Sequence, residues 1–482
     1  MNFGLVARVL GNILLIEGGA LTIPLGISLY FRERGAVIGI LLSMGILGLT
    51  GLFLSNVPVR SPRLKAREAV AIVTLGWVIV SFFAALPLVL SGAVPSFVDA
   101  LFEAVSGLTT TGATVITQVE MLPKGILLWR SLLHWLGGMG ILVLTLAILP
   151  TLGVVGFQVF KAESPGPTPD KFTPRLAATS KILYTIYTAL TALMVIAVRA
   201  AGVSWLDSFI LAFGAVGTGG FAPFSDSLMG LSPNRVLMVV LAASMFLSGV
   251  NFALYYDLLK GRWKQVWSNS ELRLYLGITA AAVLALSLNL YGRVYGTLGE
   301  TLRQAWFQVS SIMTTTGYTS ADFDLWPSFS KAVLFALMFV GGSAGSTSGS
   351  VKVVRLLVTA KVVKREINRV LHPQAARPVI INGRVMSSDV VQGVVSFLLL
   401  YVAVFALGSL VISLEGVDLL SAMSAVAATL GNVGVGFGAV GPTAGFVGLS
   451  SASKLFLSFL MLLGRLELFP LLAVLSPNFW RE

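Results

Sequence analysis

Long apolar runs separated by short polar segments dominate the chain. A helix needs about 20 mostly apolar residues to cross roughly 30 Å of hydrocarbon. Seven uncharged runs have a suitable length, at residues 36–57, 69–98, 131–160, 236–256, 274–292, 332–351 and 390–414. Three shorter or interrupted runs follow the same pattern, at residues 9–30, 182–198 and 452–475. The pattern predicts an all-α polytopic membrane protein with ten spans.

The composition excludes several soluble and catalytic classes. Hydrophobic residues make up 56% of the 482 and charged residues only 11%, whereas an ordinary globular domain carries roughly 25% charged residues. The chain has no cysteine and only two histidines, so disulfides and thiolate metal sites are excluded and His-based metal clusters or triads are disfavoured. No nucleophile–base pair emerges either. We therefore expect neither enzyme activity nor a cofactor on this chain.

Lysine and arginine are concentrated in alternate loops. The segments 57–68, 161–181, 260–273 and 352–384 hold 20 of the 33 basic residues. The positive-inside rule places these loops, and with them both termini, on the cytoplasmic side of the lipid bilayer. The net charge of +12 is therefore attributed to membrane topology and not to nucleic-acid binding.

Four segments on the opposite, outer face each combine a short apolar stretch with a glycine-containing turn. The turns read TTTGAT (109–114), GTGGF (217–221), TTTGYT (314–319) and GNVGVG (431–436). They are aligned on Gly112, Gly219, Gly317 and Gly434. In the first three, a phenylalanine stands ten residues earlier, at Phe102, Phe209 and Phe307. Because stretches this short cannot cross the bilayer, we predict four helix–pore-loop–helix repeats around a central pseudo-fourfold pore, plus two extra N-terminal transmembrane helices.

These four turns are candidates for an ion filter, because irregular backbone at membrane depth is tolerated only where protein buries it or water reaches it. Carbonyl oxygens on a common axis can replace the hydration shell of a monovalent cation, and glycine permits the positive φ that such aiming requires. The turns contain no carboxylate, which argues against a divalent cation. Ion-binding groups are expected at Thr110, Thr111, Gly112, Thr218, Gly219, Thr315, Thr316, Gly317, Asn432, Val433 and Gly434.

Several motifs accompany the turns. They are Trp129-Arg130-Ser131, His134-Trp135, Gly137-Gly138-Met139-Gly140, Pro165-Gly166-Pro167, Thr173-Pro174-Arg175, Ser248-Gly249-Val250-Asn251-Phe252 and Gly464-Arg465-Leu466-Glu467. With these residues the chain resembles, over nearly its whole length, the superfamily of potassium transporters that includes bacterial TrkH and KtrB and plant HKT proteins. The resemblance is nearest to the bacterial TrkH group, since two extra spans precede the first repeat.

The resemblance implies potassium uptake across the cell inner membrane, with the ion held at Thr111, Thr218, Thr316 and Val433. Gly112 favours potassium, because plant relatives with serine in the first turn prefer sodium. Val435 stands where TrkH-like proteins often have proline. A sodium-permeable or sodium- or proton-coupled symporter of the same superfamily is the alternative. A carrier with a midplane solute site is disfavoured, because carriers usually show two related halves and not four similar turns.

The resemblance also implies partners. It indicates a homodimer with one pore in each subunit, and a cytosolic ring of TrkA-type regulatory subunits that would carry the nucleotide. The expected regions are residues 1–62 for the N-terminal helices and 63–164, 165–268, 269–380 and 381–482 for the four repeats.

A break in the run at 332–351 marks a candidate gate. Residues 341–350 contain four Gly and four Ser, which propagate a helix poorly. The resemblance implies a movable intramembrane loop that obstructs the pore, and here Ser350 replaces a glycine common at its end. A close helix contact through small residues is the alternative. The expected gate residues are Gly341, Gly342, Gly345, Ser346, Thr347, Gly349 and Arg465.

Arg465 is a charged residue inside the last span, roughly 16 Å below Lys454 at 1.5 Å per residue. Charges at such depth are costly and by default functional, so Arg465 is expected to face the cavity under the filter and to repel cations or contact the loop. The alternative is a structural pair with Glu467 or a backbone carbonyl, although residues two apart do not share a helix face. His134 is expected to be a hydrogen-bonded core histidine and Glu17 a helix-contact residue.

Overall fold

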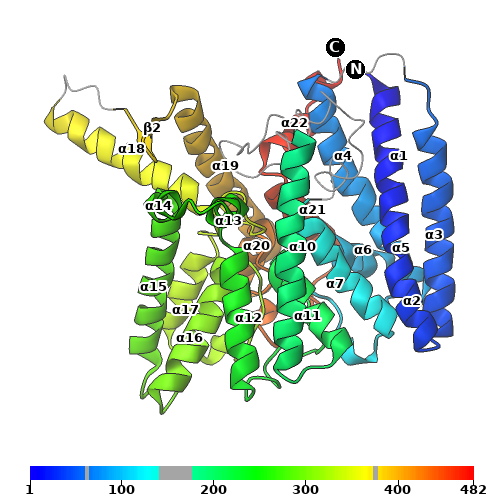
Figure 1. Cartoon of the computed structure of the whole chain (residues 1–482), viewed down its shortest axis with the longest axis horizontal. Coiled ribbons are helices and arrows are strands. Elements are labelled where there is room, and N and C mark those ends of the chain that lie inside the picture. The colour runs from blue at the N-terminus through cyan, green and yellow to red at the C-terminus, as the bar shows by residue number, and fades with distance from the viewer. Residues whose placement is uncertain (60–64, 141–175, 373–377, 482) are drawn as a thin grey trace.

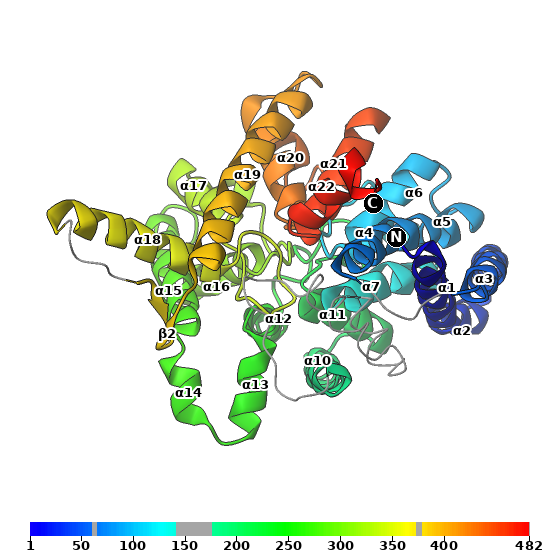
Figure 2. The same ribbon diagram turned by 90° about the horizontal axis from the view of Figure 1, so that it is seen from above.

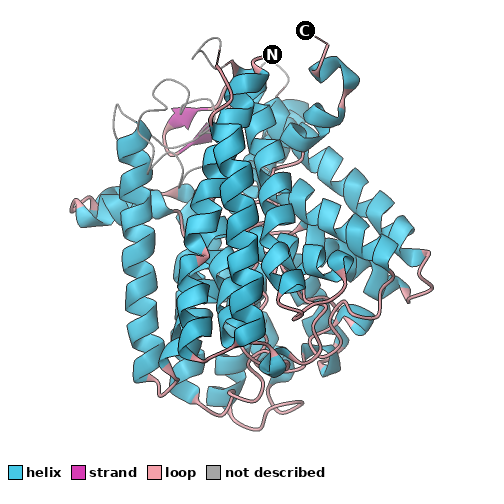
Figure 3. Cartoon of the chain, turned by 90° about the vertical axis from the view of Figure 1, so that its right-hand side faces the viewer, coloured by secondary structure: helices cyan, strands magenta, loops and turns pink. Residues whose placement is uncertain are grey.

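The computed structural model describes residues 1–59, 65–140, 176–372 and 378–481. Within this part of the chain nearly all regular structure is helical, apart from the hairpin of β1 (Ile380–Ile381) and β2 (Arg384–Val385). The described residues contain six helices long and apolar enough to cross a membrane, or eight if each of two bent pairs counts as one span. Both termini and the β-hairpin lie at the same end of the molecule (Figures 1 and 3). The all-α polytopic prediction is confirmed.

Three N-terminal helices stand at one edge of the molecule (Figure 2). They are α1 (Phe3–Ala20), α2 (Thr22–Tyr30) and α3 (Arg34–Ser55). Helices α1 and α3 approach closely, because a Cβ at Gly11 would overlap backbone atoms of Gly51 and Ser55. Small residues allow this kind of packing in a membrane. Glu17 of α1 is buried at 1% exposure.

The rest of the chain forms four units of similar order. In each, a long helix is followed by a short helix, a glycine turn and a further helix. The first is α4 (Ala66–Ala84), α5 (Leu86–Leu90), α6 (Phe97–Leu108) and α7 (Lys124–Gly138); the second is α10 (Leu176–Ala200), α11 (Trp205–Gly217) and α12 (Arg235–Ser248); the third is α15 (Ser270–Leu290), α16 (Leu298–Met313) and α17 (Ser328–Leu337); the fourth is α19 (Ser388–Ser413), α20 (Leu419–Leu430) and α21 (Ser451–Arg465).

The remaining elements connect or follow these units. They are α13 (Phe252–Leu259), α14 (Trp263–Ser268), α18 (Val353–Leu371), α22 (Phe469–Leu475) and the short 3-10 turns Val119–Met121, Phe323–Leu325, Gly438–Val440 and Pro477–Phe479. Helix α18 extends away from the helix bundle (Figures 1 and 2). The motifs at 165–167 and 173–175, the region boundaries 62/63 and 164/165 and most of the predicted span 131–160 lie outside the described residues.

Each short helix begins at a residue that can cap it. Side-chain oxygens of Ser96, Ser204, Thr297 and Asp418 accept hydrogen bonds from the backbone N–H three residues later. Such caps satisfy otherwise unpaired donors at a helix N-terminus. The same spacing therefore starts the four short helices α6, α11, α16 and α20 at equivalent places.

Hydrogen bonds join the outer segments of neighbouring units into a closed ring. Val119 N donates to Ser225 Oγ at 2.9 Å between the first and second units. Leu228 N donates to Thr319 O at 3.0 Å between the second and third, and Gly438 N donates to Asp324 Oδ2 at 2.8 Å between the third and fourth. Phe446 N donates to Thr114 O at 2.9 Å, which returns the ring to the first unit. Four units in cyclic order enclose one axis.

Two of the helices that follow the turns are sharply bent within the apolar runs 236–256 and 452–475. Helices α12 and α13 meet at 93° across 249–251, and α21 and α22 meet at 120° across 466–468. Helix α17 ends at Leu337, and residues 341–350 are non-helical, as the break predicted in the run 332–351 requires. Apolar character alone does not reveal the two bends, because the freed backbone groups find partners in neighbouring segments.

Glu415, on the outer surface, is expected to make the stability of the folded protein depend on pH. It accepts hydrogen bonds from the hydroxyls of Ser450 and Ser453 at the start of α21. These bonds lower the pKa of Glu415 below its ordinary value of 4.5. A depressed folded-state pKa means that the stabilisation is present above the ordinary pKa and is lost as the pH falls through the folded value. Thermal unfolding of the detergent-solubilised protein should therefore show Glu415→Gln losing less stability than the unsubstituted protein between pH 7 and about pH 3. Equal losses would contradict this role.

Candidate functional site

The four glycine turns share one backbone conformation. A left-handed residue begins each turn, with φ of 55° at Thr110, 54° at Thr218, 57° at Thr315 and 53° at Asn432. A glycine with φ between 81° and 87° follows two residues later, at Gly112, Gly220, Gly317 and Gly434. The match over four segments far apart in sequence confirms the predicted repetition of the turns.

The sequence alignment of the second turn on Gly219 is wrong by one residue. Gly220, and not Gly219, is equivalent to Gly112, so Gly219 corresponds to Thr111, Thr316 and Val433. Hydrogen bonds support this register, because the N–H groups of Thr111, Gly219, Thr316 and Val433 each donate to the carbonyl five residues earlier at 2.7–2.8 Å. Burial supports the same register. Ile210, ten residues before Gly220, is buried, whereas Phe209, ten residues before Gly219, is 42% exposed. Thr218 therefore does not occupy the position of Thr111.

The turns meet at their glycines. A Cβ atom added to Gly112 would overlap the carbonyl oxygen of Gly219, and one added to Gly220 would overlap that of Thr316. The same relation holds from Gly317 to Val433 and from Gly434 to Thr111, which closes the circle. Each glycine thus lies against a carbonyl oxygen of the next unit. We call these four glycines and four carbonyl-bearing residues the carbonyl ring.

Threonine hydroxyls in the turns are engaged with protein groups. Thr109 and Thr111 share a hydrogen bond at 2.8 Å, and Thr314 and Thr316 share another at 2.8 Å. Thr111 also accepts from Asn432 Nδ2 at 3.0 Å. These contacts brace the turns against their short helices and against each other. The backbone carbonyls are therefore the groups best placed to face the axis.

Glycines in the following helices let the backbone approach the turns. A Cβ at Gly137 of α7 would overlap the Leu108 carbonyl at the end of α6, and one at Gly464 of α21 would overlap the Leu430 carbonyl at the end of α20. The carboxyl ends of the short helices lead directly into the turns. The negative ends of their dipoles therefore lie beside the carbonyl ring.

Residues 341–350 form a non-helical loop against the third and fourth turns and the end of α11. Gly349 N donates to Thr315 Oγ1 at 2.7 Å, and a Cβ at Gly349 would come close to the Gly431 carbonyl and the Asn432 side chain. Thr347 Oγ1 donates to Val216 O at 3.1 Å, at the end of α11. The second, third and fourth units therefore all contact this loop.

The broken helices anchor the other end of the loop. Ser343 N donates to Gly249 O at 2.8 Å, and Phe252 N donates to Gly345 O at 3.0 Å. Ala344 N donates to Glu271 Oε1 at 2.6 Å. Gly341 and Gly345 take φ of 75° and 71°, while Ser350 takes 61°, a region that favours glycine. The loop is thus a defined structure and not the small-residue helix contact considered as an alternative.

Arg465 connects the loop to the first unit. Its Nη1 donates to Thr347 O at 3.0 Å and lies 3.3 Å from Thr110 Oγ1. Its Nη2 donates to the carbonyls of Gly137 and Gly138. The expected loop contact and the alternative of backbone carbonyl partners are therefore both present, whereas Glu467 pairs with Arg355.

Sequence reasoning missed two residues that hold the loop, Lys352 and Glu271, and the ion pair of Arg355 beside it. Lys352 is 3% exposed and donates through Nζ to Ser348 O, while Arg355 pairs with Glu467 and Glu271 accepts from Ala344. In the sequence, these residues could have been noticed because each carries a charge beside an apolar run. Both Lys352 and Arg355 lie in the basic segment 352–384, which the positive-inside rule predicts to be a cytoplasmic loop.

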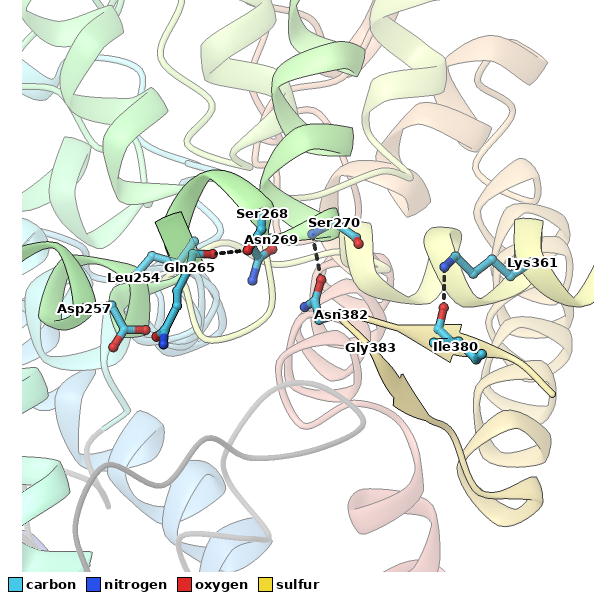
Figure 4. A pocket seen from close by; sticks show the side chains of 10 residues that line it. All are labelled: Leu254, Asp257, Gln265, Ser268, Asn269, Ser270, Lys361, Ile380, Asn382 and Gly383. Atoms are coloured by element: carbon cyan, nitrogen blue, oxygen red, sulfur yellow. Dashed lines mark hydrogen bonds between the residues drawn. The ribbon is translucent and has the colours of Figure 1, made fainter. Parts of the chain in front are cut away.

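A polar pocket of about 580 Å³ lies between the α13–α14 segment, α18 and the β-hairpin (Figure 4). Asn382 Oδ1 accepts from Ser270 N at 2.7 Å at one side of it, and Lys361 Nζ donates to Ile380 O at the other. Asp257 and Gln265 also line the pocket. These segments adjoin the loop through Glu271 and through the start of α18.

The chain is similar to known transport proteins over its whole length. Residues 48–481 match the model of the TrkH family, described as cation transport proteins. The chain is 36% identical to the Trk system potassium uptake protein TrkH of Escherichia coli and 38% identical to that of Halomonas elongata, with full coverage of both sequences in each case. It is 33% identical to TrkG of Escherichia coli over 95% of each chain.

A solved structure gives the same result for the fold. The crystal structure of the potassium transporter TrkH from Vibrio parahaemolyticus superimposes with a TM-score of 0.88, at 34% sequence identity and with complete coverage of both chains. The relatives are named as transport proteins, in agreement with the expected non-enzymatic function. The sequence matches and the superposition together place this multi-pass membrane protein in the TrkH family of cation transport proteins.

Proposed function

We propose that the protein takes up potassium ions across the cell membrane through a pore that passes along the axis of the carbonyl ring. The closed circle of glycines and carbonyl oxygens is the observation that carries the proposal. The names of the relatives as potassium uptake proteins support the choice of ion.

Ion recognition rests on backbone oxygens. The carbonyls of Thr111, Gly219, Thr316 and Val433 replace the hydration shell of a large monovalent cation. Thr110, Thr218, Thr315 and Asn432 supply the preceding carbonyls, and the positive φ of Gly112, Gly220, Gly317 and Gly434 keeps the turns in this conformation. Potassium is held at the carbonyls of Thr111, Gly219, Thr316 and Val433, with Gly219 in place of Thr218, which the sequence alignment predicts.

The loop at 341–350 and Arg465 form the gate. The loop lies against the third and fourth turns and the end of α11, and Arg465 ties it to Thr110 of the first turn, so an ion leaving the ring meets both. The guanidinium adds a positive charge that repels cations. Displacing the loop breaks its hydrogen bonds to Thr315, Val216 and Arg465, and this movement opens the path.

Control of the gate comes from the cytosolic side. The name Trk system indicates more than one component, and a TrkA-type ring with bound nucleotide is the regulatory partner. The protein is a homodimer in the inner membrane, with both termini, α18 and the β-hairpin in the cytosol. The concentration of basic residues in the segments 260–273 and 352–384 supports this orientation. Residues 1–62 form the N-terminal region, and the four repeats divide near residues 164, 268 and 380.

Flux into liposomes tests the proposed function. Purified protein should carry potassium or rubidium down a gradient, and reversal potentials measured in potassium, sodium and proton gradients should follow potassium. Empty liposomes give the background, and valinomycin added at the end gives the full capacity. A reversal potential that follows sodium, or depends on protons, would support the symporter alternative; organic-solute uptake without ion flux would contradict an ion pathway.

A further inference from the structure

The second turn lacks the side-chain brace found in the first and third. There, Thr109 bonds to Thr111 and Thr314 bonds to Thr316, each pair at 2.8 Å. The first threonine of each pair also donates to its short helix, to Val105 O and Ser310 O at 2.7 Å. In the register set by the backbone, the equivalents in the second turn are Gly217 and Gly219, which have no side chains.

His134 fills this space from the neighbouring unit. It belongs to α7 in the first unit and is 0% exposed. A Cβ atom on Gly219 would overlap the imidazole ring, and one on Gly217 would come within 2.6 Å of the His134 carbonyl oxygen. Gly219 therefore makes room for the imidazole, and Gly217 allows the close approach of the α7 backbone, so that a side chain at position 219 and the His134 ring exclude each other.

The imidazole links the first and second units through both nitrogens. Its Nε2 lies 3.1 Å from the backbone N–H of Phe221, which can only donate, so Nε2 accepts. Nδ1 therefore carries the proton and donates to Gly107 O at 2.7 Å, near the end of α6. One neutral tautomer satisfies both contacts. The ring thus ties a short helix of one unit to the residue that follows Gly220 in the next.

Neighbouring groups hold this arrangement from the outer side. The ring of Phe221 packs on His134 with centroids 4.3 Å apart, and the guanidinium of Arg130 lies 4.1 Å from the Phe221 centroid. Arg130 is paired with the buried carboxylate of Glu103, which also accepts from Thr114 at 2.9 Å. His134 therefore belongs to a buried polar connection between the first and second turns.

We propose that His134 is a positioning residue for cation selectivity, which sets the place of the Gly219 carbonyl in the carbonyl ring. This inference rests on the proposed function of that ring. Hydroxyl pairs brace the first and third turns from within, whereas a histidine from the adjacent unit braces the second. The second turn thus depends on a contact between units where the first and third turns have a contact within one unit.

His134→Leu removes both hydrogen bonds of the imidazole and keeps a side chain of similar size. Leucine leaves the backbone N–H of Phe221 buried without an acceptor. The lost hydrogen bond should change the relative binding of the two ions at the carbonyl ring, so we expect the ratio of potassium to sodium uptake to fall about tenfold. Total cation flux should persist, because no group enters the pore. His372→Leu is the matched control, since His372 is exposed at the end of α18. A folded His134→Leu protein with an unchanged ratio would overturn the proposal.

A substitution cycle tests the exclusion between His134 and a side chain at position 219. Gly219→Thr alone should greatly lower the amount of folded protein, because its side chain overlaps the imidazole. His134→Ala combined with Gly219→Thr removes the imidazole from that space, and should recover folding relative to Gly219→Thr alone. Equal folding of Gly219→Thr with and without His134 would contradict the predicted overlap, whatever the result for His134→Leu.

Size-exclusion profiles and thermal unfolding separate folding from selectivity in every variant. His134→Gln serves if His134→Leu does not fold, because an amide keeps one donor and one acceptor; its ratio should lie between those of His134→Ala and the unsubstituted protein. A folded His134→Gln no better than His134→Ala would count against the hydrogen-bond role. If the unsubstituted protein itself shows no potassium preference, the proposed function of the ring fails. If it shows the preference and the His134 variants keep it, only this inference fails.

Discussion

Gly317→Ala is expected to abolish selective potassium uptake. The new methyl group would overlap the Val433 carbonyl oxygen, and alanine at φ of 81° costs about 1–2 kcal/mol in addition. Because Val433 contributes one of the four carbonyls, the ring must distort or rotate that group away. We expect potassium uptake to fall by more than about tenfold, with loss of preference over sodium, since each 1.4 kcal/mol corresponds to a factor of ten.

Gly299→Ala is the matched control for this substitution. Gly299 lies in the first turn of α16 in the same unit, and a Cβ atom there meets no atom within 4 Å. Uptake of potassium and sodium by both variants should be measured in liposomes at equal amounts of folded protein. Potassium-selective uptake by a folded Gly317→Ala protein at the level of the control would exclude the carbonyl ring as the filter.

Removal of residues 342–348 is expected to open the pore. A Cβ at Gly341 would come within 2.5 Å of the Gly349 carbonyl, so the two ends of the deletion already lie side by side and can be joined. The deletion removes the contacts of the loop with Val216 and Arg465 while α17 and α18 remain. We expect potassium flux without any regulatory subunit to rise by about tenfold or more, as for the loss of a barrier of at least 1.4 kcal/mol.

Arg465→Ala separates the charge from the loop. It removes the guanidinium and its contacts with Thr347 and Thr110 but leaves the loop in place, so we expect a smaller increase in closed-state flux than the deletion produces. Arg262→Ala is the control, because Arg262 is 53% exposed and pairs with Asp257 away from the turns. Closed-state flux that stays unchanged in Arg465→Ala would reject the barrier role of this residue. A folded deletion protein that loses flux would reject the loop as an obstruction.

Local signals in the sequence were sufficient for the helices and the turns. Apolar length predicted the spans that became α3, α15 and α19, and capping residues such as Ser96 and Asp418 start short helices where the pattern placed them. The glycine turns were recognisable because a positive-φ backbone needs glycine at defined places. The breaks in the following helices were not, since Gly249 and Gly464 resemble ordinary small residues of a membrane helix until their neighbours are known.

The register of the second turn could not be predicted from the local sequence. GTGG offers three glycines, and only the shared φ pattern and the contact with the Thr316 carbonyl identify Gly220 as the equivalent of Gly112. The reason for this different sequence lies in another unit, where the His134 imidazole occupies the space of a side chain at Gly219 and the His134 carbonyl lies against Gly217. No spacing within the second unit carries that information.

The sequence by itself determined the membrane class, the fourfold repetition and the non-helical loop at 341–350, because each depends on apolar length or on residues close together in the chain. Only the tertiary structure decided which carbonyl faces which glycine, that Arg465 contacts Thr347 and two backbone carbonyls, and that Glu467 pairs with Arg355. These partners lie between about 110 and 330 residues apart in sequence. Their choice depends on steric fit and on satisfying buried polar groups, which act only after the four units have packed around their axis.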